Sequence, residues 1–164
     1  MYRITAAPID GLSIGADYID AGGTTGTNAQ TAEAGGAYIA YQIGNFEVGY
    51  QERYSAPAIA DKIGAGAHNY KMTGIGIEFA VNDALSISYL EEESERRSYG
   101  AAVDAAAGAS PFTRTTIAFE SDYVMVAYDV GGATLGLTNI ESANSGYVSG
   151  ASTTKTLATI SMAF

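Results

Sequence analysis

Residues 75–89 read Ile-Gly-Ile-Glu-Phe-Ala-Val-Asn-Asp-Ala-Leu-Ser-Ile-Ser-Tyr. On both sides of the central Asn82-Asp83 pair, apolar side chains hold every second position, and Gly, Glu and Ser fill most of the positions between them. A period of two is typical of a β-strand with one apolar and one polar face. Asn and Asp tolerate the backbone conformations of tight turns. The stretch therefore predicts two neighbouring antiparallel strands joined by a short turn.

The same hairpin unit repeats four times, with short turns and long connections in strict alternation. The short turns lie at 8–11, 44–45, 82–83 and 131–132, and the long connections at 21–31, 55–67, 96–111 and 142–150. Transmembrane barrels have short turns at one rim and longer loops at the other, whereas soluble sandwiches mix connection lengths. The alternation therefore favours a barrel.

The division into turns and connections predicts an all-β chain of about nine strands. The expected strands are 1–7, 11–20, 34–43, 46–54, 69–81, 84–95, 113–130, 133–141 and 152–164. We expect them to form one unit over residues 1–164, an antiparallel up-and-down transmembrane β-barrel or part of one.

Composition separates this chain from soluble globular domains and from helical membrane proteins. Charged residues make up 16 % of the sequence, against roughly 25 % in a typical soluble domain, so we expect something other than water to cover part of the surface. Hydrophobic residues make up 47 %, but no run approaches the roughly 18 apolar residues that a membrane-spanning helix needs. Strands are therefore the expected membrane-crossing elements.

Charge and the reactive residue types exclude several classes of function. The net charge of −10 argues against a nucleic-acid partner and favours cations. There is no Cys, and no spacing typical of a metal site or cofactor motif, so we expect neither a metal nor a cofactor. The only histidine, His68, has no Ser or Asp arrangement beside it, so we interpret it as an exposed loop residue and expect no enzyme.

Alternate positions of the expected strands separate into an apolar and a polar set. The apolar set, expected to face lipid, is Leu12, Ile14, Phe46, Val48, Ile75, Ile77, Phe79, Leu85 and Ile87. The polar set, expected to line a pore, is Asp17, Glu47, Gln51, Arg53, Glu78, Ser86, Ser88, Glu92 and Lys155. A polar face suits bulk water as well as a wet lumen, so the pattern alone leaves both interpretations open.

Two kinds of segment do not follow this simple pattern. In 34–43 and 113–130 apolar residues occur at both parities, which a bulge or a contact on the inner face would explain, so their faces stay unassigned. The acidic run 91–95 lies where a strand is expected to pass into a long loop. Its charges would either attract cations at a channel mouth or simply oppose aggregation as a solvated strand end.

The last nine residues, Thr156 to Phe164, form an alternating stretch that ends on an aromatic side chain. They resemble the closing strand of Gram-negative outer-membrane general diffusion porins, and Thr5 to Tyr18 and Phe79 to Tyr89 look like hairpins of that family. In the family, alternate apolar residues and a final Phe are the signal that the barrel-assembly machinery recognises. Ile160, Met162 and Phe164 match those positions.

The resemblance implies a fold, a location and a set of partners. Porins of this family have sixteen strands and assemble as homotrimers in the outer membrane, so nine strands would be the C-terminal part of the barrel. The implied function is a water-filled channel for passive diffusion of ions and small hydrophilic solutes, surrounded by outer-membrane lipid, with an acid excess that favours cations. The alternative hypothesis is a soluble or surface-exposed all-β binding module, in which the apolar face packs into a protein core.

Overall fold

The computed structural model describes residues 1–23, 29–59, 66–99 and 114–162, which form nine strands and one short 3-10 turn. The strands are β1 (Tyr2–Ala6), β2 (Leu12–Gly23), β3 (Thr31–Ile43), β4 (Phe46–Ala56), β5 (Gly66–Asn82), β6 (Leu85–Tyr99), β7 (Arg114–Asp129), β8 (Ala133–Ala143) and β9 (Ser152–Met162). The 3-10 turn, η2 (Ser145–Tyr147), lies between β8 and β9. The expected all-β class and nine strands are confirmed.

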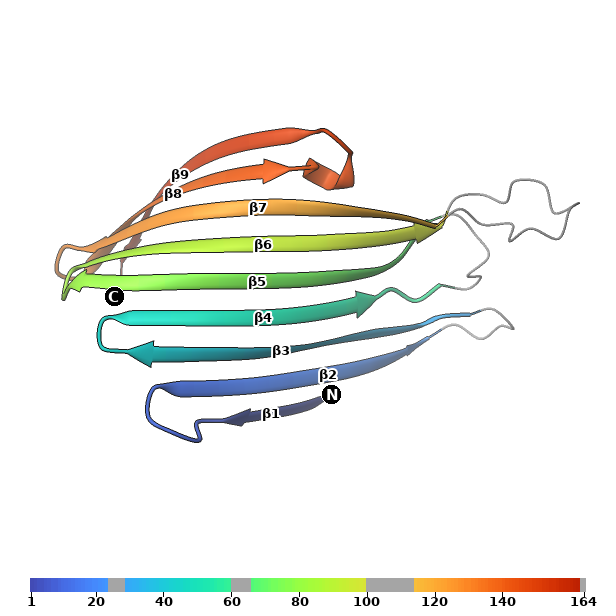
Figure 1. Ribbon diagram of the computed structural model, residues 1–164, viewed down its shortest axis with the longest axis horizontal. Helices are drawn as coiled ribbons and strands as arrows, with labels where there is room; N and C mark the ends of the chain where they lie inside the picture. The colour runs from blue at the N-terminus through green and yellow to red at the C-terminus, as the bar shows by residue number, and fades with distance from the viewer. Residues whose placement is uncertain (24–28, 60–65, 100–113, 163–164) are drawn as a thin grey trace, which may run out of the picture.

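Each strand pairs antiparallel with its neighbour in the sequence, so the sheet has the order β1 to β9 without a crossover. Figure 1 shows this up-and-down ladder, in which β8 and β9 bend out of the plane of the other strands. No pairing joins β1 to β9 in the described part of the chain, so these two strands are the edges of an open sheet. The closed barrel of the sequence-based expectation is therefore not formed by these nine strands alone.

Several strands run farther than the sequence indicates. β2 continues to Gly23, β3 begins at Thr31, and β6 continues through the acidic run to Tyr99. β6 stays extended beyond its expected end at residue 95 because it pairs on both sides: Arg96 lies opposite Tyr70 on β5 and opposite Ile117 on β7. Two backbone ladders outweigh the poor strand propensity of a charged stretch. The acidic run is consequently part of a strand and not its end.

Strand register decides the faces of the two segments that the sequence left unassigned. On β3, Ile39 lies directly opposite Ile14, and on β7 Val124 points to the same side of the sheet. β7 has no bulge in either of its pairings. Its Phe119 points to the other side, where the ring centroid lies 5.9 Å from that of Tyr147. The contact between Phe119 and Tyr147, and not a bulge, therefore explains why β7 carries a large apolar side chain on that side of the sheet.

The β1–β2 turn depends on Gly11. This residue has φ +76°, and a Cβ added to it would lie 2.3 Å from the backbone oxygen of Gln42. We expect Gly11→Ala to destabilise the sheet by about 2 kcal/mol, because it adds a backbone clash to the usual cost of the left-handed region. The matched control is Gly44→Ala, at φ +60° with no atom within 4 Å of the added Cβ, which should cost about 1 kcal/mol. Equal losses in denaturant titrations of the two variants would contradict this account of the turn.

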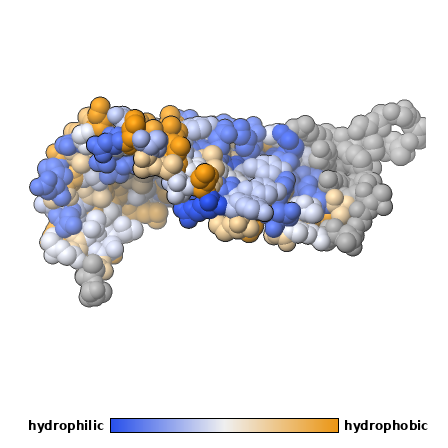
Figure 2. All heavy atoms as spheres, turned by 90° about the horizontal axis from the view of Figure 1, so that it is seen from below, coloured by the Kyte–Doolittle hydropathy of each residue, from blue (hydrophilic) through white to orange (hydrophobic). Residues whose placement is uncertain are grey.

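The sheet is a single layer with almost no buried apolar side chain. Ala56 is the only buried hydrophobic residue in the described part of the chain, and many large apolar side chains are exposed. Seen from the β1 side, Figure 2 shows an arched profile with hydrophobic atoms gathered along its upper outline, over the half that carries the short turns. None of the described helical segments is long and apolar enough to cross a bilayer.

Candidate functional site

The two faces of the sheet differ in chemistry, and strand register assigns each residue to one of them. We call the side that carries Ile77 the apolar face, and the side that carries Glu78 the polar face. Every residue of the apolar set lies on the apolar face: Leu12, Ile14, Phe46, Val48, Ile75, Ile77, Phe79, Leu85 and Ile87. Their contact with lipid stays a prediction, but they do share one surface.

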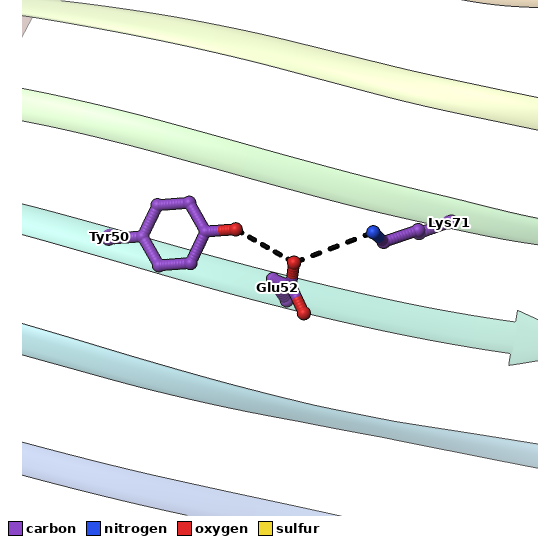
Figure 3. A network of polar contacts seen from close by, with 3 residues as sticks. All are labelled: Tyr50, Glu52 and Lys71. Carbon is purple, nitrogen blue, oxygen red and sulfur yellow. Dashed lines mark hydrogen bonds and ion pairs between the residues drawn. The ribbon is translucent and has the colours of Figure 1, made fainter.

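Tyrosine hydroxyls mark the boundary between the apolar and the charged part of the apolar face. Three tyrosines donate a hydrogen bond to a carboxylate that lies nearer the long connections: Tyr18 to Glu33 at 3.1 Å, Tyr50 to Glu52 at 2.7 Å and Tyr89 to Asp122 at 2.5 Å. Figure 3 shows the second pair, in which Glu52 also lies 3.5 Å from the ammonium group of Lys71. An apolar ring with a polar tip suits a boundary between an apolar medium and water.

Aromatic rings also lie near the short turns, at the other end of the same face. Phe46 and Phe79 stack there with ring centroids 4.5 Å apart and an interplanar angle of 27°. Apolar side chains such as Val48 and Ile77, which are directly opposite each other, fill the space between these rings and the tyrosines. The apolar face thus has an aliphatic band between the boundary tyrosines and this phenylalanine pair.

The boundary of this band runs obliquely across the sheet. The boundary residue of β2, Tyr18, lies level with Tyr54 of β4, whereas the boundary residue of β4 itself is Tyr50, nearer the short turns. On β6 the last large apolar residue of the apolar face is Tyr89, and the acidic side chains of Glu91, Glu93 and Glu95 follow on the same face. A band that steps toward the turn rim from one strand to the next is what strands tilted across a slab would show.

The polar face carries every residue of the expected pore-lining set. These residues are Asp17, Glu47, Gln51, Arg53, Glu78, Ser86, Ser88, Glu92 and Lys155. Of the acidic run, only Glu92 and its neighbour Ser94 lie on this face, because successive residues alternate sides. The sequence pattern thus separated the two faces, although it gives no contacts between their residues.

Two charged groupings on the polar face follow from the register. Glu47 lies directly opposite Glu78 on the neighbouring strand, an arrangement of like charges that destabilises a sheet. Asp17 and Arg53 lie on either side of Gly36, where an added Cβ would be 3.7 Å from Asp17 Oδ1 and 3.1 Å from Arg53 Cγ. No group of three or more His, Asp or Glu residues is placed to hold a metal ion anywhere in the described ranges.

Sequence reasoning missed the aromatic residues of the polar face. Tyr38 lies across Gly15, where an added Cβ would be 2.4 Å from the tyrosine ring. Tyr70 and Phe119 lie on this face too, and both rings contact Tyr147, with centroids 5.7 Å and 5.9 Å away. These two contacts join the connection between β8 and β9 to two strands that are distant in the sequence, so no local pattern could indicate them.

The interpretation of His68 was wrong. His68 lies in β5 and is only 4 % exposed, not on an open loop. The side-chain amide of Gln30 donates hydrogen bonds to the backbone oxygens of His68 at 2.7 Å and Pro57 at 2.9 Å. Residue 30 also pairs with Ile59 in an isolated bridge, so the chain before β3 covers this part of β5.

No protein-family model matches the sequence. No curated protein matches it either.

Proposed function

We propose that this chain forms the wall of a porin-type channel in the outer membrane of a Gram-negative bacterium. Ions and small hydrophilic solutes would diffuse passively along its polar face, and outer-membrane lipid would cover its apolar face. The observation that carries the proposal is a one-layer sheet with large apolar side chains exposed on one face and charged and small polar side chains on the other.

The exposed apolar face needs a cover. Ile75 is 52 % exposed, Ile77 47 % and Leu137 51 %, all on this face. Burying one such side chain fully stabilises a protein by about 1.5–3 kcal/mol, and a domain normally gains this by packing two layers together. The described residues supply no second layer, and contiguous apolar surface of this extent marks a membrane or partner contact. We propose that this cover is hydrocarbon, because aromatic side chains lie on both sides of the aliphatic band, as they do at the two interfaces of a membrane barrel.

The proposed channel also requires the open sheet to close. β1 and β9 both run toward the rim of the short turns, since an even number of antiparallel steps separates them. An all-antiparallel barrel would therefore need an odd number of further strands between these edges. Seven further strands would give the sixteen strands of general porins. On the same resemblance we propose that the complete protein assembles as a homotrimer and that the barrel-assembly machinery inserts it.

Vesicle flotation tests this proposal against its alternative, a soluble or surface-exposed all-β binding module. The full chain, refolded in the presence of phosphatidylcholine vesicles, should float with them and stay bound through an alkaline wash. Without vesicles or detergent it should aggregate, because nothing covers the apolar face. A chain that stays dispersed and folded in plain buffer would favour the binding module and contradict the membrane assignment.

A further inference from the structure

The connection between β8 and β9 lies over the polar face and brings Tyr147 to three other strands. The Tyr147 hydroxyl is 2.6 Å from Ser94 Oγ on β6. The Arg96 guanidinium lies 4.9 Å from the centre of the Tyr147 ring and donates a hydrogen bond of 3.2 Å to the Tyr147 backbone oxygen. With the ring contacts to Tyr70 and Phe119, these interactions fix the tyrosine on the polar face.

This placement is maintained against backbone strain. Tyr147 has φ +60° and Asn144 has φ +52°, conformations that residues other than Gly adopt at a cost. The Asn144 side chain donates to the Ala118 backbone oxygen at 2.8 Å and accepts from the Gly150 backbone N–H at 3.0 Å. A residue that this many contacts hold against backbone strain forms a fixed wall rather than a mobile loop tip.

A hollow of about 510 Å³ opens on the polar face beside Tyr147, within the usual range for small-molecule sites. Ile19, Tyr70 and Met72 add apolar surface to its lining, so this part of the polar face is not purely hydrophilic. Asp17 and Arg53 also line it. Within the described ranges, no hydrogen bond or ion pair engages either side chain.

We infer that this hollow binds free amino acids with an aromatic or large apolar side chain. The ligand carboxylate would pair with Arg53, its ammonium group with Asp17, and its side chain would pack on Tyr70 and Tyr147. One acid and one base beside Gly36 match the two charges of an α-amino acid, and the apolar wall matches its side chain. This inference rests on the proposed function, because the face that holds the hollow would be the channel lumen.

A ligand series on the full chain in detergent micelles tests the inference without any substitution. Isothermal titration or saturation-transfer NMR should give saturable binding of L-phenylalanine. Phenylacetate, phenethylamine and L-alanine each lack one of the three matched groups, so each should bind about tenfold more weakly. Equal binding of all four compounds, or no saturable binding of L-phenylalanine, would overturn the proposal.

Variants locate the site. Arg53→Gln and Asp17→Asn should each weaken L-phenylalanine binding about tenfold, and Tyr70→Ala should weaken it as well. Tyr123→Ala is the matched control, because Tyr123 lies on the polar face outside the hollow and its loss should leave binding unchanged. Loss of binding in the control alone would place the ligand elsewhere and contradict the inference.

Vesicle flotation separates a failure of this inference from a failure of the proposed function. A chain that inserts into vesicles but binds no L-phenylalanine overturns the amino-acid site alone. A chain that binds L-phenylalanine with these requirements but does not insert overturns the channel and supports the site.

Discussion

Ile77→Arg is expected to destabilise the sheet in a lipid bilayer by about 2–4 kcal/mol. Ile77 lies in the middle of the apolar band, directly opposite Val48 on one side and Tyr89 on the other. If this band faces hydrocarbon, the guanidinium loses its water among side chains that carry no opposite charge. Urea unfolding of the two proteins in lipid vesicles measures the difference.

Glu78→Arg is the matched control for this substitution. It places the same side chain one residue further along β5, on the polar face, where it gains an opposite charge in Glu47. We expect it to leave stability unchanged or to raise it by up to about 1 kcal/mol, because an opposite-charge pair replaces two like charges. Tolerance of Ile77→Arg together with a large loss for Glu78→Arg would mean that the faces are reversed.

The second large effect concerns ion selectivity. The chain has 18 acidic and 8 basic residues, and the described strands place five acids on the polar face, Asp17, Glu47, Glu78, Glu92 and Asp129, against four bases, Arg3, Arg53, Arg96 and Lys155. Charges inside a narrow passage are screened less than those on an open surface, so we expect the complete channel to prefer cations. The reversal potential across a bilayer with a salt gradient should have the sign of cation passage.

Replacing both Glu47 and Glu78 by Gln should shrink this reversal potential. The same change should also raise stability by about 0.2–1 kcal/mol at low salt, because it removes like charges that lie directly opposite each other. The matched control replaces Glu91 and Glu93, which lie on the apolar face, by Gln. It removes the same amount of charge and should leave ion selectivity unchanged. An anion-preferring channel, or one unaffected by the first pair, would contradict the assignment of the lumen.

Much of the fold could be predicted from the sequence because its determinants are local. Alternation around Asn82-Asp83 and around the other short turns indicates strands and their pairing, and parity then separates the faces. Both predicted residue sets lie together for this reason. The last residues of β6, 96–99, could not be predicted, because the ladders on both sides of Arg96 depend on β5 and β7.

Features that depend on distant segments were not predictable. Tyr147 lies in a connection, and its contacts with Tyr70 and Ser94 form only when strands far apart in the sequence pack side by side. His68 is buried by the chain around Gln30, which its own neighbours in the sequence do not indicate. Phe164, the last residue of the expected assembly signal, lies outside the described residues, whereas Ile160 and Met162 lie on the apolar face of β9.

Site-directed spin labelling tests the central claim most directly, that one face of the sheet meets lipid and the other meets water. The chain has no Cys, so Ile77→Cys and Glu78→Cys each provide one unique attachment site for a nitroxide. In vesicles, the label at position 77 should be more accessible to dissolved oxygen and the label at position 78 to a water-soluble nickel chelate. Equal accessibility of both labels to the nickel chelate would contradict the account.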